Sequence, residues 1–167
     1  PRTGEQMYTG FADVDAFERA MKGSAHPMVY NGDIVDTASW EKIRQRFPEI
    51  NRVMIGRGIL SNPFLPEQIK GLKCDSQNTA ILNNDSQKRK RLKNFHQDLF
   101  NSYKQVFSGP GHLIGRMKGL WSYLGPSFEN SSKPLKKLLK SNSEQDYSNR
   151  VSEFWEMNLK FCPGRIE

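Results

Sequence analysis

The chain has 167 residues, of which 36% are hydrophobic and 26% charged, a composition typical of globular proteins and sufficient for one modest domain or two small ones. No apolar run approaches the ~20 residues that cross a bilayer and no secretion signal opens the chain, so we expect a cytoplasmic protein without a membrane segment. Residues 1–72 carry nine basic and nine acidic side chains, so the whole net charge of +7 lies in residues 73–167. This asymmetry is typical of a neutral segment followed by one that binds a polyanion. Solvated helix faces are also basic and are the alternative explanation.

Two helices are predicted in the first half of this neutral segment. Asp15 and Glu18 have the spacing of a capping box at the start of the first helix. Thr37 is the expected N-cap of the second helix, which Pro48 closes. The apolar residues at helical spacing are Val14, Phe17 and Met21 in the first helix and Trp40, Ile43 and Phe47 in the second.

Two short apolar runs, residues 27–30 and 52–55, are predicted as buried strands. The first ends at Asn31-Gly32-Asp33 and the second at Gly56-Arg57-Gly58, after which Asn62-Pro63 has the form of a helix start. Strands that alternate with helices in this way are typical of a parallel sheet or a β/α barrel. Both predicted strands therefore end in loops that contain glycine.

Residues 73–85 are rich in Ser, Asn and Asp and show no periodicity, so we expect a linker there, with a helical domain at 86–167. Four apolar stripes at helical spacing predict a small bundle. The stripes are Leu92, Phe95, Leu99, Tyr103 and Val106; Leu113, Met117, Leu120, Trp121 and Leu124; Leu135, Leu138 and Leu139; and Tyr147, Val151, Phe154, Trp155 and Leu159. We interpret the aromatic residues Trp121, Tyr123, Phe154 and Trp155 as bundle core, with base stacking as the alternative.

The two loops that contain glycine are predicted to bind one phosphate group. Glycine leaves backbone N–H groups accessible to an anion, and in barrels of eight strand-helix units the last two loops hold a cofactor phosphate. Arg57 adds charged donors suited to phosphate oxygens. Asn31 and Asp33 either bind the ligand or build the turn. Each motif is weak alone, and their position at the ends of neighbouring strands carries the prediction.

Three motifs of the neutral segment resemble, in order and spacing, those of the tRNA-dihydrouridine synthases. They are residues 1–10 (PRTGEQMYTG), 29–34 (VYNGDI) and 53–63 (VMIGRGILSNP), and residues 116–124 (RMKGLWSYL) resemble the family more loosely. Members of that family are FMN-dependent barrels with a C-terminal helical domain, and they use NADPH to reduce particular uridines of tRNA. The resemblance implies that residues 1–72 are the last units of a TIM (β/α)8 barrel and that residues 86–167 bind tRNA.

Site residues follow from the same resemblance. It implies that Asn31, Gly32 and Asp33 line one side of the FMN phosphate and ribityl site and that Gly56 and Arg57 line the other. In the family the Arg-Thr pair follows a flavin-contacting histidine, and a tyrosine downstream lies near the target uracil. Arg2 and Tyr8 are therefore the expected substrate contacts.

No catalytic residue is expected in this chain, because the family's proton-donating cysteine and flavin-contacting lysine precede the matched motifs. The chain starts within a motif and without Met, which indicates a fragment that is inactive alone and needs the N-terminal half of the same protein to cover its strand edges. Cys74 and Cys162 lack metal-ligand spacing, so we expect two reduced thiols and no metal. The histidines His26, His96 and His112 are interpreted as surface or packing residues.

Basic residues predict where the helical domain at 86–167 binds RNA. They cluster at a helix start, where the helix dipole favours acids, so phosphate groups are the expected partners. The predicted tRNA contacts are Lys88, Arg89, Lys90, Arg91, Lys93, Arg116 and Lys118, and Lys133, Lys136, Lys137 and Lys140 extend the basic surface. A solvated charged face is the alternative. The target base would enter the flavin pocket by flipping.

Two other functions remain open from the sequence. The helical part acts as an RNA-binding module without activity, or the chain belongs to another FMN- or phosphate-binding TIM-barrel oxidoreductase in which the basic bundle is incidental. The favoured function is FMN-dependent, NADPH-driven reduction of uridine in tRNA.

Overall fold

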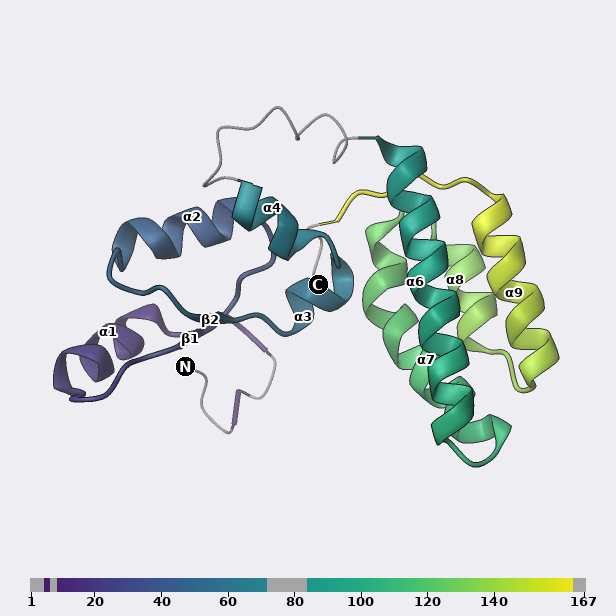
Figure 1. Ribbon diagram of the computed structural model, residues 1–167, viewed down its shortest axis with the longest axis horizontal. Coiled ribbons are helices and arrows are strands. Elements are labelled where there is room, and N and C mark those ends of the chain that lie inside the picture. Colours follow the sequence, from purple (N-terminus) through teal and green to yellow (C-terminus); the bar gives the residue numbers. More distant parts are fainter. Residues whose placement is uncertain (1–4, 7–8, 72–83, 164–167) are drawn as a thin grey trace.

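A computed structural model describes residues 5–6, 9–71 and 84–163. The first elements are α1 (Val14–Gly23), β1 (Tyr30–Asn31), α2 (Thr37–Arg46), β2 (Val53–Met54), α3 (Arg57–Ser61) and α4 (Leu65–Gly71), here called the strand-helix part. They are followed by α6 (Asp85–Val106), α7 (Pro110–Leu124), the 3-10 helix η1 (Gly125–Ser127), α8 (Ser132–Leu139) and α9 (Glu144–Glu156), here called the helical bundle. Figure 1 shows the two groups side by side, with α3 and α4 on the side of the strand-helix part that is nearest the helical bundle. No helix in the described ranges is long and apolar enough to cross a membrane.

The two strands pair in parallel, with Tyr30 opposite Val53 and Asn31 opposite Met54. Parallel strands need a crossover connection, which α2 provides. The strand-helix-strand order predicted from the sequence is confirmed, but each strand is only two residues long, shorter than the predicted runs at 27–30 and 52–55. Among the described residues each strand pairs only with the other strand, and the pairing is limited to these two residue pairs.

The first helix begins after a different residue from the one predicted. Asp13 is the N-cap, and its carboxylate accepts a hydrogen bond from the backbone N–H of Ala16 at 2.8 Å. The predicted capping box of Asp15 and Glu18 is therefore wrong. Both carboxylates instead accept hydrogen bonds from the guanidinium of Arg46 at the end of α2, at 2.7 Å for Glu18, so long-range pairing replaces local capping.

The second helix is capped by Asp36, one residue before the predicted Thr37. The Asp36 carboxylate accepts from the backbone N–H of Ser39 at 2.7 Å, and the Ser39 hydroxyl accepts from the backbone N–H of Asp36 at 3.1 Å. This reciprocal pair satisfies two otherwise unpaired donors, which a single threonine does not. Farther on, the prediction missed the short helix α3, and the helix expected at Asn62 begins at Leu65.

A first hydrophobic core holds the strand-helix part together. Phe17 of α1 packs its ring against Tyr30 at 5.0 Å and against Phe47 at 5.3 Å, measured between ring centroids. The other buried residues of this core are Ile34, Trp40, Ile43, Ile50, Leu65 and Ile69. The predicted apolar residues of α1 and α2 are thus the residues that hold both helices against the strands.

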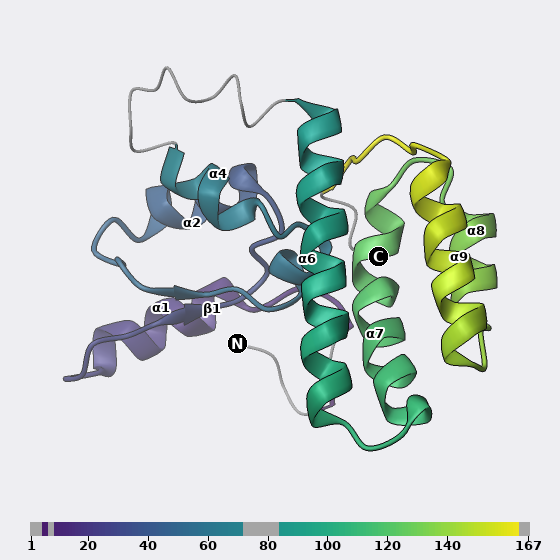
Figure 2. The ribbon, with the colours of Figure 1, turned by 45° about the vertical axis from the view of Figure 1, so that its right-hand side comes forward.

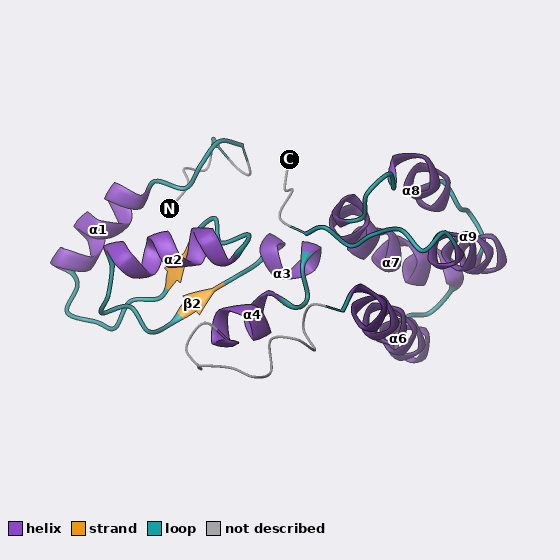
Figure 3. Ribbon diagram, turned by 90° about the horizontal axis from the view of Figure 1, so that it is seen from above, coloured by secondary structure: helices purple, strands orange, loops and turns teal. Residues whose placement is uncertain are grey.

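A second hydrophobic core fills the helical bundle, whose helices are seen end-on in Figure 3. The predicted stripe of α7 is buried as expected, with Met117, Trp121 and Leu124 fully enclosed. On α6 the prediction is partly wrong. Phe95 and Val106 are 42% and 77% exposed, and the buried face runs through Leu92, His96 and Phe100 at intervals of four residues.

One side chain of the strand-helix part belongs to the core of the bundle. Phe64, between α3 and α4, packs edge-to-face against Phe161 with ring centroids 5.9 Å apart. The guanidinium of Arg91 on α6 lies 4.8 Å from the centroid of the Phe64 ring and donates two hydrogen bonds to the Glu67 carboxylate, one at 3.0 Å. Figure 2 shows α6 and α7 side by side at this junction. Residues 72–83, most of the predicted linker at 73–85, lie outside the described residues.

Candidate functional site

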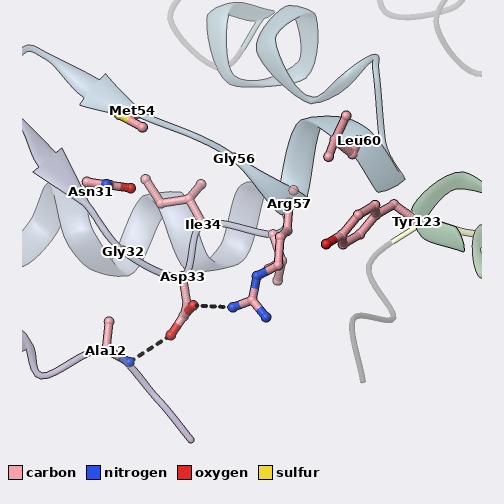
Figure 4. A pocket seen from close by; sticks show the side chains of 12 residues that line it. Ala12, Asn31, Gly32, Asp33, Ile34, Met54, Gly56, Arg57, Leu60 and Tyr123 are labelled. Atoms are coloured by element: carbon pink, nitrogen blue, oxygen red, sulfur yellow. Dashed lines mark hydrogen bonds and ion pairs between the residues drawn. The ribbon is translucent and has the colours of Figure 1, made fainter. Parts of the chain in front are cut away.

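The two predicted phosphate-binding turns lie side by side. Because β1 and β2 are parallel, their carboxyl ends meet at one edge, and both turns line a pocket of about 560 Å³ (Figure 4). The pocket is lined by Ala12, Asn31, Gly32, Asp33, Ile34, Val35, Met54, Gly56, Arg57, Gly58, Leu60 and Tyr123. All five residues predicted to bind the cofactor are among them.

Glycine at two positions of the second turn serves two different purposes. A β-carbon at Gly58 would stand 2.2 Å from the carbonyl oxygen of Ile34, so only glycine allows the start of α3 to approach the segment after β1 so closely. A β-carbon at Gly56 would meet no atom within 4 Å, because this residue borders the open space of the pocket. Gly58 thus brings the turns together, and Gly56 leaves backbone accessible between them.

An ion pair connects the two turns. The guanidinium of Arg57 donates to the carboxylate of Asp33 at 3.1 Å, and the second oxygen of Asp33 accepts from the backbone N–H of Ala12 at 2.7 Å (Figure 4). Both side chains are about three-quarters buried. Asp33 therefore holds the guanidinium against the pocket wall and ties the segment before α1 to the same site.

Tyr30 fixes the shape of the first turn from below the pocket lining. Its side chain is buried, and a β-carbon at Gly32 would stand 2.3 Å from its hydroxyl oxygen, so glycine is needed where the turn passes over the ring. Burial raises the pKa of this hydroxyl, with a further contribution from the negative charge of Asp33.

One lining residue comes from the helical bundle and was misread in the sequence. Tyr123 of α7 was interpreted as core, like Trp121, but it is 38% exposed and lines the pocket beside Leu60. Two residues along an α-helix turn the side chain by about 200°, so Tyr123 lies on the face opposite the fully buried Trp121. Figure 4 shows its ring extending from α7 toward Arg57.

The comparison with known proteins decides the family. The profile described as dihydrouridine synthase (Dus) matches residues 1–153, which is most of the chain. The chain belongs to the dihydrouridine synthase family. A segment of 71 residues is 38% identical to the tRNA-dihydrouridine(16) synthase of Cupriavidus necator and covers 42% of this chain and 22% of that protein. The match thus spans about a fifth of the length of that relative. The family resemblance seen in the sequence motifs is confirmed.

Four other residues were singled out from the family motifs or from their chemistry. Arg2, Tyr8 and Cys74 lie outside the described residues, so their predicted roles stay predictions. Cys162 is half-buried, and its thiol lies 3.1 Å from the carboxylate of Glu129, a hydrogen bond that raises the pKa of the thiol. Cys162 therefore remains a thiol at neutral pH and lacks the thiolate character of a nucleophile.

The three histidines take the structural places expected of them. His26 and His112 are exposed, and His96 is buried in the bundle. Nε2 of His96 lies 2.7 Å from the hydroxyl of Tyr147, which also accepts from Nε1 of Trp121 at 3.0 Å. The interpretation of these histidines as surface or packing residues is confirmed.

The basic residues at the start of α6 differ in what they contact. Arg89 pairs with Asp85 at 3.3 Å, and Arg91 pairs with Glu67 across the junction. Within the described ranges, no carboxylate lies in ion-pair distance of Lys88, Lys90 or Lys93. Both arginines of the predicted group are thus engaged within the chain, and the lysines are not.

The two predicted RNA contacts of α7 are also engaged internally. The guanidinium of Arg116 lies 5.8 Å from the ring centroid of Phe107. The ammonium of Lys118 donates to the backbone carbonyl of Ser141, just after α8. Arg116 is exposed and keeps its charge at the surface, whereas Lys118 helps to hold α8 against α7.

Four exposed lysines of α8 and its C-cap form a basic face, called the α8 lysine face. Lys133, Lys136, Lys137 and Lys140 are spaced at three- and four-residue intervals, so they share one side of the helix. Leu138, on the opposite side, is fully buried. Among the side chains that the structure describes, no carboxylate pairs with any of the four. The α8 lysine face therefore presents an uncompensated positive charge.

Proposed function

We propose that this chain is the part of a tRNA-dihydrouridine synthase that anchors the phosphate of FMN and binds tRNA. One observation carries the proposal: the turns Asn31-Gly32-Asp33 and Gly56-Arg57-Gly58 form one pocket, with Arg57 at its wall. Family membership and the similarity to a tRNA-dihydrouridine(16) synthase support the activity. Because the match spans only part of that relative, the activity of the whole protein is proposed here.

The residues present fit a flavin phosphate. Gly56 leaves its backbone open to the pocket, so a phosphate oxygen has room to approach the chain without meeting a side chain. Arg57 offers a planar guanidinium, which suits a phosphate, and Asp33 keeps it in place. Asn31 and Gly32 line the same pocket and would be the contacts of the ribityl chain.

The chemistry that FMN supplies when bound is the transfer of hydride from NADPH to the uracil ring of tRNA, which gives dihydrouridine once a proton is added. The role of this chain is to bind and orient. Arg57 and the two turns hold the phosphate, and Asp33 fixes Arg57. We assign no catalytic acid to the described residues, and Arg2 and Tyr8 remain the proposed substrate contacts. The proton donor and the rest of a TIM (β/α)8 barrel would come from the N-terminal half of the protein, with β1, α2 and β2 among the last units of the barrel.

We propose that the helical bundle binds tRNA and that the enzyme acts in the cytoplasm. Phosphates of a folded RNA are attracted by lysines that no carboxylate neutralises, and each contact releases counterions. On α6 these lysines are Lys88, Lys90 and Lys93, together with the α8 lysine face. Arg89, Arg91, Arg116 and Lys118 stay in the proposed surface, although their internal contacts indicate a mainly structural role for Arg91 and Lys118.

The test is an Arg57→Ala variant of the protein at its full native length. FMN retention should fall by roughly 10- to 100-fold, because a charged hydrogen-bonding partner of the phosphate is lost, while tRNA affinity changes little. Arg52→Ala is the matched control, since Arg52 is exposed at the other end of β2 and does not line the pocket. Equal FMN retention in the two variants would remove this pocket from flavin binding.

Two outcomes would instead favour other functions. Native protein that binds tRNA but no flavin would be an RNA-binding module without activity. Native protein that reduces a small enone with NADPH and ignores tRNA would be a different flavin oxidoreductase. Absorbance of bound flavin and tRNA titration by fluorescence anisotropy separate these cases.

A further inference from the structure

We propose that the hydroxyl of Tyr123 binds the phosphate group of the flavin, so that the helical bundle contributes a contact to the cofactor site. The inference rests on the proposed function, because it adds a residue to the same pocket. Among the described residues that line this pocket, Tyr123 alone belongs to the bundle, and the others lie between Ala12 and Leu60. The two glycine-containing motifs in the sequence did not predict a role for Tyr123 at this site.

The helix holds Tyr123 in a position from which it reaches the pocket. Trp121 and Leu124, on the inner side of α7, are fully buried in the bundle, which fixes the rotation of the helix. Tyr123 is therefore directed away from the core, toward the strand-helix part. In Figure 4 its ring extends from α7 past Leu60, and its hydroxyl is the part nearest Arg57.

The junction between the two parts keeps this position constant. Helix α3, which begins at Arg57, packs directly against α7. Phe64, four residues after Leu60, is buried in the core of the bundle, and Arg91 of α6 covers its ring and pairs with Glu67. Because α7 packs against α3, the backbone that carries Tyr123 keeps one place relative to Arg57, as an element that positions a ligand-binding group must.

The chemistry of the pocket favours a phosphate as the group that Tyr123 contacts. A tyrosine hydroxyl is a neutral donor, and hydrogen bonds to an anionic acceptor are about twice as strong as those between neutral groups. Arg57 and the backbone at Gly56 approach the same space from the strand-helix part. Tyr123 would donate from the opposite wall, so a phosphate monoester with three terminal oxygens would have donors on more than one side.

The test compares FMN with riboflavin, which lacks the phosphate, on the protein at its full native length. Tyr123→Phe keeps the ring and removes the hydroxyl. It should weaken FMN binding by about tenfold and leave riboflavin binding unchanged. Tyr103→Phe is the matched control, because Tyr103 is a bundle tyrosine that packs against Phe107 and does not line the pocket. Quenching of flavin fluorescence gives both affinities, and thermal melting confirms that each variant is folded.

The possible results are distinct from those that test the proposed function. Unchanged FMN affinity in Tyr123→Phe, with weak binding in Arg57→Ala, would overturn this inference and leave the flavin site standing. An equal loss for FMN and riboflavin would overturn it too, because the hydroxyl would then contact the ribityl chain or the ring. A loss of tRNA affinity with FMN binding unchanged would assign Tyr123 to an RNA phosphodiester. Native protein that binds neither flavin would end both proposals.

Discussion

A β-carbon on Gly58 would stand 2.2 Å from the carbonyl oxygen of Ile34. This close approach joins the start of α3 to the segment that follows β1, and it brings the two turns of the pocket together. The contact is between backbone atoms, which have little room to move without displacing β1 or α3.

Gly58→Ala should therefore destabilise the protein, whereas Gly56→Ala should not. At Gly58 the added methyl must displace backbone, a change that costs about 1–3 kcal/mol of unfolding free energy. At Gly56 it meets no atom within 4 Å, so stability should stay within about 0.5 kcal/mol. Urea unfolding of the two variants measures the difference, and equal stabilities would contradict the close approach. Gly56→Ala should still weaken FMN binding, because its methyl group stands in the pocket.

The contact between α4 and α6 predicts the effect of Arg91→Ala. Arg91 pairs with Glu67 and covers the ring of Phe64, and the hydrogen bond from Arg91 lowers the pKa of the Glu67 carboxyl. Both charged side chains are about half exposed, so the unfolding free energy should fall by roughly 1 kcal/mol or less. Hydrogen exchange should nevertheless quicken in α3 and α4, which this side chain connects to the bundle.

Arg89→Ala is the control for this prediction. Arg89 pairs with Asp85 within α6 and has no described partner in the strand-helix part. If its removal accelerates exchange in α3 and α4 as much as Arg91→Ala does, the junction does not depend on Arg91.

Buried His96 predicts a dependence of stability on pH. Burial lowers the pKa of His96 from about 6.5 to about 4. The folded imidazole therefore stays neutral down to about pH 4, whereas the unfolded one takes up a proton below about pH 6.5. The unfolding free energy should fall as the pH is lowered through this interval, by up to about 3 kcal/mol in total. Above about pH 6.5 His96 is neutral in both the folded and the unfolded state, so the unfolding free energy is not reduced by its titration.

The comparison with His96→Gln isolates this contribution, because carboxylates also titrate at low pH. Glutamine retains an oxygen that accepts from the Tyr147 hydroxyl but carries no titrating group. The unfolding free energies of the two proteins, measured by denaturant titration from pH 7.5 to 4, should converge or cross as the pH falls. Parallel curves would show that His96 is not held neutral by burial.

The α8 lysine face predicts a specific loss of RNA affinity. Lys136→Glu together with Lys137→Glu should weaken tRNA binding and reduce the slope of log affinity against log salt by about two, since each lost phosphate contact removes close to one counterion. The control is Lys42→Glu with Arg44→Glu, an equal charge change on the exposed surface of α2. An equal loss in the control would indicate attraction by net charge alone.

The order of strands, helices and turns in the strand-helix part follows from the sequence itself. Alternating apolar runs, each followed by glycine, predict two parallel strands and two adjacent loops, since strand and helix patterns differ in period and glycine interrupts both. The apolar stripe of α7 and the family motifs could also be predicted from the sequence, because they too are patterns of residues close together in the chain. These are local signals, and the five proposed cofactor contacts come from them.

Tertiary structure decided which of these residues act together. The N-caps of α1 and α2 are Asp13 and Asp36, because the carboxylates of these residues accept hydrogen bonds from backbone N–H groups of the first helical turn. The carboxylate of Asp15 instead accepts a hydrogen bond from Arg46, which is distant in sequence. Likewise, no sequence pattern places Tyr123 at the pocket, because only the packing of α7 against α3 brings it near Arg57. Local sequence sets the type and order of the elements. Contacts between distant elements set which side chains share a site, since they depend on how two packed surfaces meet.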